Sequence, residues 1–119
     1  MKDILLGMRG TNVLHTLSMG ESRTVDLFEG DQGLEVWEET RGPVTLDLFG
    51  TPTHVNRIAL GGESLTRVCT LLGHASGDAV AALSEFFQKG EKTAMDLIDW
   101  LDRAGISYES GDSPDGFLI

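Results

Sequence analysis

The spacing of apolar residues changes within residues 54–72, which read HVNRIALGGESLTRVCTLL. Before Gly61 and Gly62, short runs alternate between apolar and polar residues, a pattern typical of strands with one solvated face. After these glycines, four apolar residues recur at the i, i+3, i+4 and i+7 spacing of an amphipathic helix: Leu65, Val68, Cys69 and Leu72. This change of period predicts strands in the first half of the chain and helices in the second.

Five runs in the first half alternate as a strand does, and short turns rich in glycine separate them. The strands are predicted at residues 11–19, 23–28, 34–39, 44–49 and 54–60. Consecutive strands joined by such short turns are typical of an antiparallel meander.

Two further helices are predicted in the second half. One begins after Ser76 and ends at Gly90, and the other begins after Thr93 and ends at Gly105. Serine and threonine are common N-caps, and glycine commonly follows a helix C-terminus. Asp96, which follows Thr93 at the N3 position, completes a variant of the capping box.

These elements predict an α+β fold, in which an antiparallel meander of about five strands packs against about three C-terminal helices. Residues 1–119 are expected to form a single domain, because the chain has no linker long enough to divide it. Residues 1–60 are mainly strands and residues 63–104 mainly helices. Residues 105–119 form a short strand at 106–109 and a loop-like tail with an apolar end at 117–119.

The chain carries 9 Lys and Arg residues against 19 Asp and Glu residues, which gives a formal net charge of −10. Such an excess of negative charge disfavours direct binding to nucleic-acid phosphates and to anionic membrane surfaces. The sequence has no apolar run long enough for a transmembrane helix, and its first residues are not expected to form a signal peptide. The single cysteine, Cys69, lies on an apolar helical stripe, which fits a reducing compartment. We therefore expect a cytoplasmic protein.

The sequence contains no motif for a metal or a cofactor. The acidic residues lack the spacing of a calcium-binding loop, and the zinc-ligand spacings do not occur. Gly61 and Gly62 precede a predicted helix, but they lie outside the glycine frames that bind phosphate and are followed by Glu63. We therefore expect no bound metal or cofactor.

The acidic residues form two groups suited to binding a partner. Asp96, Asp99 and Asp102 recur every three residues on the last predicted helix, with Trp100 among them. The second group is expected on the sheet: Glu35, Trp37, Glu38, Glu39 and Asp47. Carboxylates around aromatic anchors favour docking to a basic protein, because complementary charge speeds association and a buried aromatic ring supplies affinity. The alternative interpretation is a solvated face that only keeps the chain dissolved.

His15 and His54 lie on predicted strands and suggest a different function. Two facing histidines would serve as general acid and general base in an enzyme of the ribonuclease type. The alternative is two half-exposed histidines without a catalytic role, because the sequence offers no third catalytic partner.

In size, negative charge, α+β organisation and expected compartment, the chain resembles the small acidic immunity proteins that bacteria make against secreted or contact-delivered toxins. The resemblance implies a non-enzymatic inhibitor that blocks a basic toxin domain, for instance one that acts on nucleic acid. We expect a monomer or a weak homodimer. Two alternatives stay open: a phage-type inhibitor of host defence that mimics nucleic acid, and a small histidine-dependent enzyme.

Overall fold

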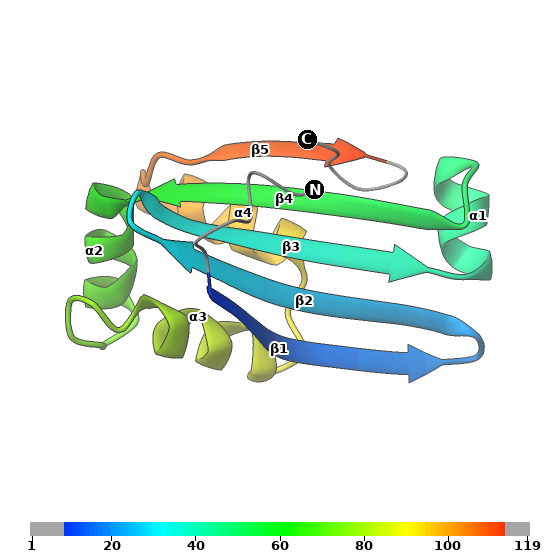
Figure 1. Cartoon of the computed structure of the whole chain (residues 1–119), viewed down its shortest axis with the longest axis horizontal. Helices are drawn as coiled ribbons and strands as arrows, with labels where there is room; N and C mark the ends of the chain where they lie inside the picture. Colours follow the sequence, from blue (N-terminus) through cyan, green and yellow to red (C-terminus); the bar gives the residue numbers. More distant parts are fainter. Residues whose placement is uncertain (1–8, 114–119) are drawn as a thin grey trace.

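The structure, a computed structural model, describes residues 9–113. Five antiparallel strands form one sheet in the order β1-β2-β3-β4-β5, so that each strand pairs with the next strand along the chain (Figure 1). The strands are β1 (Arg9–Ser18), β2 (Glu21–Gly30), β3 (Gly33–Arg41), β4 (Thr53–Gly61) and β5 (Glu109–Ser113). The helices are α1 (Pro43–Phe49), α2 (Gly62–Leu71), α3 (Ala79–Gln88) and α4 (Ala94–Ala104). The predicted α+β fold is confirmed, and the described residues contain four helices rather than about three.

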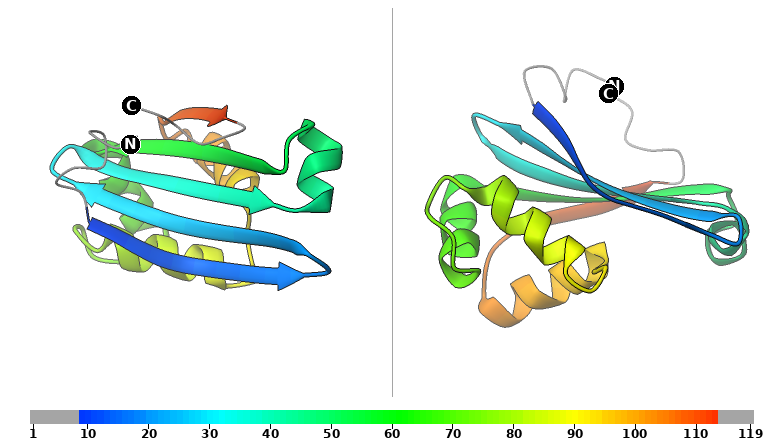
Figure 2. Two further views of the ribbon diagram at one scale, coloured as in Figure 1. Left: turned by 45° about the vertical axis from the view of Figure 1, so that its right-hand side comes forward. Right: turned by 90° about the horizontal axis from the view of Figure 1, so that it is seen from below.

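The hydrophobic core lies between one face of the sheet and helices α2, α3 and α4 (Figure 2). Val25, Val36 and Ile58 contribute to it from three neighbouring strands, and Phe87 and Leu97 contribute from the helices. Side chains alternate along a strand, so the neighbours of these strand residues point to the opposite face. No helix of the described residues covers that opposite face (Figure 2).

Helix α1 replaces the strand predicted at residues 44–49, and this is a correction. Pro43 lies in the first turn, where its fixed φ suits a helix and its missing N–H costs no hydrogen bond. The Glu21 carboxylate, which comes from β2, accepts hydrogen bonds from two backbone N–H groups of this turn and from the Thr45 hydroxyl. Gly50 ends the helix in the left-handed conformation, with φ 77°. The contacts at the two ends of α1 therefore favour a helix, although residues 44–49 alternate between apolar and polar as a strand does.

The predicted start of α4 is confirmed. Thr93 Oγ1 accepts a hydrogen bond from the Asp96 N–H (3.2 Å), and Asp96 Oδ2 accepts one from the Thr93 N–H (2.8 Å). This reciprocal pair is a capping box, and it satisfies two N–H groups that a helix start would otherwise leave unpaired. Helix α3 differs from the prediction, because its N-cap is Asp78 and not Ser76.

Strand β5 also differs from the prediction. It spans Glu109–Ser113 rather than residues 106–109, and so it includes part of the predicted loop. Ile106 is only 3% exposed and packs in the core, so the chain reaches the edge of the sheet after this residue. The apolar end predicted at residues 117–119 lies outside the described residues.

Candidate protein-binding surface

Six large apolar side chains are exposed at one end of the sheet, which we call the α1 end. They are Leu17, Met19, Val44, Leu46, Leu48 and Phe49. Figure 1 shows α1 and the β1–β2 turn at the same end of the sheet, opposite α2. A Cβ atom on Gly20 in that turn would lie 3.8 Å from Pro43 Cδ, which places the turn against the start of α1. Met19 is 94% exposed and Leu48 is 71% exposed.

Helix α1 is attached to the sheet through His54 of β4. The Phe49 ring stacks on the His54 imidazole, with ring centroids 3.6 Å apart and an angle of 5° between the planes. His54 Nε2 lies 2.9 Å from Asp112 Oδ2 of β5, and the His54 residue is buried. One buried imidazole thus joins α1, β4 and β5. The exposed side chains of α1 are therefore presented on a fixed helix, which lowers the entropy cost of binding a partner.

The two histidines considered as an acid–base pair do not face each other. His15 lies on β1 and His54 on β4, with β2 and β3 between them. His15 Nδ1 is 3.1 Å from Thr24 Oγ1, whereas His54 is stacked on Phe49. General acid–base chemistry that requires both imidazoles at one site is therefore not supported by this geometry.

Glu35, one of the predicted partner-binding residues of the sheet, is buried. Its carboxylate accepts hydrogen bonds from Arg57 Nε (2.8 Å), Arg57 Nη2 (2.7 Å) and Trp37 Nε1 (2.8 Å). Burial opposes the charged form, but these hydrogen bonds and the Arg57 charge outweigh it and hold the pKa of Glu35 below its usual value. Trp37 also packs edge to face on Phe28, with ring centroids 5.5 Å apart. Glu35 and Trp37 thus join β3 to its neighbouring strands.

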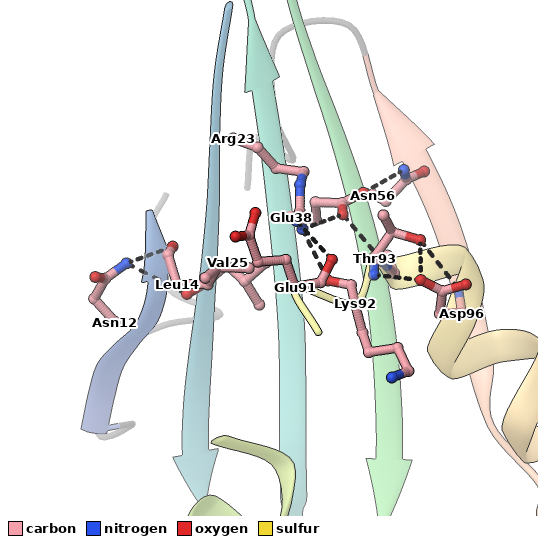
Figure 3. A network of polar contacts seen from close by, with 11 residues as sticks. Asn12, Leu14, Arg23, Val25, Glu38, Asn56, Glu91, Lys92, Thr93 and Asp96 are labelled. Atoms are coloured by element: carbon pink, nitrogen blue, oxygen red, sulfur yellow. Dashed lines mark hydrogen bonds and ion pairs between the residues drawn. The ribbon is translucent and has the colours of Figure 1, made fainter. Parts of the chain in front are cut away.

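Glu38 is buried as well, and it connects the sheet to α4 (Figure 3). Its carboxylate accepts hydrogen bonds from Arg23 Nη1 (3.2 Å), Asn56 Nδ2 (3.3 Å) and the Ala94 N–H at the start of α4 (3.0 Å). Arg23 also donates to two backbone carbonyl oxygens in the loop that precedes α4. Because both predicted partner-binding carboxylates are buried among contacts within the chain, we leave Glu35 and Glu38 out of the binding surface.

Glu39 and Asp47, the other two acidic residues predicted on the sheet, lie nearer the surface. Glu39 pairs with Arg41 at 3.3 Å, and both side chains are largely open to solvent. Asp47 is exposed on α1 rather than on the sheet, which corrects its predicted position. Asp47 is the predicted binding residue that the structure places among the apolar side chains of the α1 end.

The three carboxylates of α4 are not equivalent. Asp96 belongs to the capping box, and the hydrogen bond from the Thr93 N–H is the main cause that lowers the pKa of Asp96. Asp102 accepts a hydrogen bond from the Tyr108 hydroxyl (2.8 Å), and this bond raises the pKa of Tyr108. Asp99 is exposed, and within residues 9–113 it has no ion pair. Of the predicted row, Asp99 alone makes no hydrogen bond or ion pair within the described residues.

Trp100 is partly exposed, as predicted, and its ring packs against Phe86 with centroids 6.0 Å apart. The apolar side chains of α1 were not among the predicted binding residues, because alternation divides them between the two faces of a strand. Two local features of the sequence indicate a helix there: Pro43 suits the first turn of a helix, and Gly50 suits the position that follows its end.

A cavity of about 660 Å³ lies where β4 passes into α2, beside Gly61 and Gly62. Glu63 and Glu109 are among the residues that line it, and their negative charges disfavour a phosphate there. The described part of the chain has no group of three or more His, Cys, Asp or Glu side chains that could hold a metal ion.

Comparison with protein-family models, with curated proteins and with solved structures found no match. Among the helices that the structure describes, none is long and apolar enough to cross a membrane. The function is therefore inferred from the geometry and charge of the α1 end.

Proposed function

We propose that this chain is a non-enzymatic binding protein whose α1 end docks onto a cationic protein, in the manner of a cytoplasmic immunity protein that blocks a toxin. The observation that carries the proposal is the set of six exposed apolar side chains at the α1 end. They are six of the eight large apolar side chains that are exposed in residues 9–113.

The apolar character of α1 calls for a partner. A surface helix normally buries its apolar stripe against the core, yet all four large apolar side chains of α1 are exposed and its only buried residue is Thr45. Large exposed apolar patches on soluble proteins commonly mark protein interaction sites. Burying Leu48 and Met19 in a partner would remove the two most exposed apolar side chains of the described chain from water.

The charge of the chain selects the kind of partner. A net charge of −10 attracts a cationic surface and speeds encounter with it. A second copy of the chain would bring the same negative charge, including another Asp47, against the α1 end. An anionic membrane surface would repel the chain for the same reason. A basic protein with an apolar pocket therefore fits the α1 end best.

Site-specific photo-crosslinking tests the proposal. A photoreactive phenylalanine analogue at Leu48, introduced in the cells that make the protein, is expected to crosslink one basic protein, which mass spectrometry identifies. The matched control carries the same analogue at Met95 of α4, which is 55% exposed and lies outside the α1 end. Adducts that are identical at both positions, or an adduct with a second copy of this chain, would contradict the proposal.

The isolated partner then separates the finer alternatives. An immunity protein restores growth when it is co-expressed with a partner that stops growth alone, and its association rate falls as salt is added. A nucleic-acid mimic would instead compete with DNA or RNA for the partner. If the partner is neither toxic nor a nucleic-acid binder, the chain is a docking protein for another basic protein, and the proposal that it is an immunity protein is wrong.

A further inference from the structure

A second cavity, of about 390 Å³, lies between α2 and α4 and is separate from the α1 end. Arg67 and Leu71 line it from α2, and Trp100, Arg103 and Ala104 line it from α4. Residues three or four positions apart share one face of a helix. The cavity is therefore an open groove beside these two helix faces, and two of the nine cationic residues of this acidic chain line it.

Arg67 is held in place at the edge of this groove. Its Nη1 donates to the carbonyl oxygen of Gly105 and its Nη2 to that of Ala104, both at 2.9 Å, where α4 ends. A guanidinium has five N–H donors, so donors remain for a ligand after these two bonds are made. Because the side chain is already ordered, a ligand that binds it loses less of its affinity to side-chain entropy.

Arg103 and Trp100 complete the groove. Within the described residues, Arg103 makes no hydrogen bond or ion pair, although the chain carries a large excess of carboxylates. The Trp100 ring packs against Phe86, with centroids 6.0 Å apart, and is partly exposed. Leu71 adds an exposed apolar side chain on the other wall. A guanidinium that is unpaired among residues 9–113 thus lines the same pocket as a partly exposed indole ring.

We propose that this groove, which we call the α2–α4 groove, binds a small aromatic carboxylate. The planar fork of a guanidinium matches a carboxylate group, and an indole ring offers a flat apolar surface for an aromatic body. The volume of the groove falls in the range of small-molecule sites, which run from roughly 300 to 1,000 Å³. The proposal does not depend on docking at the α1 end, because it uses different residues on different helices.

Titration of the full chain with 2-naphthoate tests the proposal, with the uncharged 2-naphthamide as the matched probe. The chain has two tryptophans, so its NMR spectrum contains two indole N–H signals. 2-Naphthoate is expected to shift the Trp100 signal saturably and to leave the Trp37 signal in place. 2-Naphthamide is expected to bind at least about tenfold more weakly, because it lacks the charge that the two arginines recognise.

Two variants complete the test. Arg103→Gln is expected to weaken 2-naphthoate binding about tenfold, whereas Arg41→Gln, which removes an exposed arginine of β3, is expected to leave it unchanged. The absence of a saturable shift of the Trp100 signal would overturn the proposal. Equal binding of naphthoate and naphthamide, or equal binding by the two variants, would also overturn it, because each result shows that the arginines of the groove do not select the ligand.

Discussion

Substitution Glu38→Gln tests the buried polar network that joins the sheet to α4. The Glu38 carboxylate accepts hydrogen bonds from Arg23, Asn56 and the Ala94 N–H, and its side chain is only 6% exposed. The amide retains the shape of the side chain and one carbonyl acceptor, but it removes the negative charge. Arg23 then keeps its two backbone carbonyl acceptors and loses its ionic partner, in a site where its side chain is 16% exposed.

Removal of one partner from a buried ion pair costs roughly 3–5 kcal/mol. Arg23 keeps two carbonyl acceptors and some contact with water, so we expect Glu38→Gln to lower the free energy of unfolding by about 3 kcal/mol, the lower end of this range. With an unfolding entropy of about 2.1 cal/mol/K per residue, this loss lowers the melting temperature of a 119-residue chain by about 12 °C. The matched control is Glu39→Gln on the same strand, which removes an exposed pair with Arg41 and is expected to cost at most about 0.5 kcal/mol.

Thermal unfolding followed by circular dichroism measures both variants under the same conditions, and urea unfolding supplies their free energies of unfolding. The expected result is a large loss for Glu38→Gln and almost none for Glu39→Gln. Losses that agree within about 0.5 kcal/mol would refute the reasoning, because they would show that burial does not distinguish the two carboxylates.

Three further predictions concern named contacts. Thr93→Ala removes the N-cap hydroxyl of α4 and is expected to lower the free energy of unfolding by about 1 kcal/mol in urea unfolding; no change would exclude a stabilising capping box. Asp102→Asn is expected to lower the pKa of Tyr108 towards its ordinary value, which ultraviolet titration of the single tyrosine measures directly, and an unchanged or higher pKa would contradict the hydrogen bond. The pKa of Glu35 is lowered in the folded chain from its ordinary value of 4.5. Its carboxylate therefore stabilises the fold at pH values above 4.5, and this contribution is lost as the pH falls through the pKa of the folded state. Glu35→Gln is therefore expected to make the loss of stability in acid shallower, and an equally steep loss would contradict this assignment.

Much of the fold could be predicted from local patterns. Periodicity shows which side of an element is apolar. The structure confirms the strands predicted from alternation in residues 23–28 and 34–39, and the helix predicted from the spacing of Leu65 to Leu72. The capping box of Thr93 and Asp96 is local as well, since both partners lie within one helical turn. Such features are encoded within a few residues of each other.

The errors arose where partners lie far apart in the sequence. Helix α1 depends on Glu21, which accepts hydrogen bonds from its first turn and lies on β2, the strand next to β3, while the run itself alternates as a strand does. Glu35 and Glu38 are buried because Arg57 and Arg23 reach them from neighbouring strands, in a register that the sequence alone does not reveal. From the sequence alone, an acidic residue in a strand is therefore predicted to be solvent-exposed, because the cationic partner that allows its burial is not known.

The most direct test of the proposed function is the dissociation constant of the complex with the isolated crosslinked partner. Leu48→Lys places a positive charge at the α1 end, and Met95→Lys makes the same change in charge on α4. Both residues are exposed, so neither substitution is expected to unfold the chain. We predict that Leu48→Lys raises the dissociation constant at least about tenfold while Met95→Lys leaves it within about twofold of the wild-type value. Equal effects of the two substitutions, or unchanged binding by Leu48→Lys, would contradict docking through the α1 end.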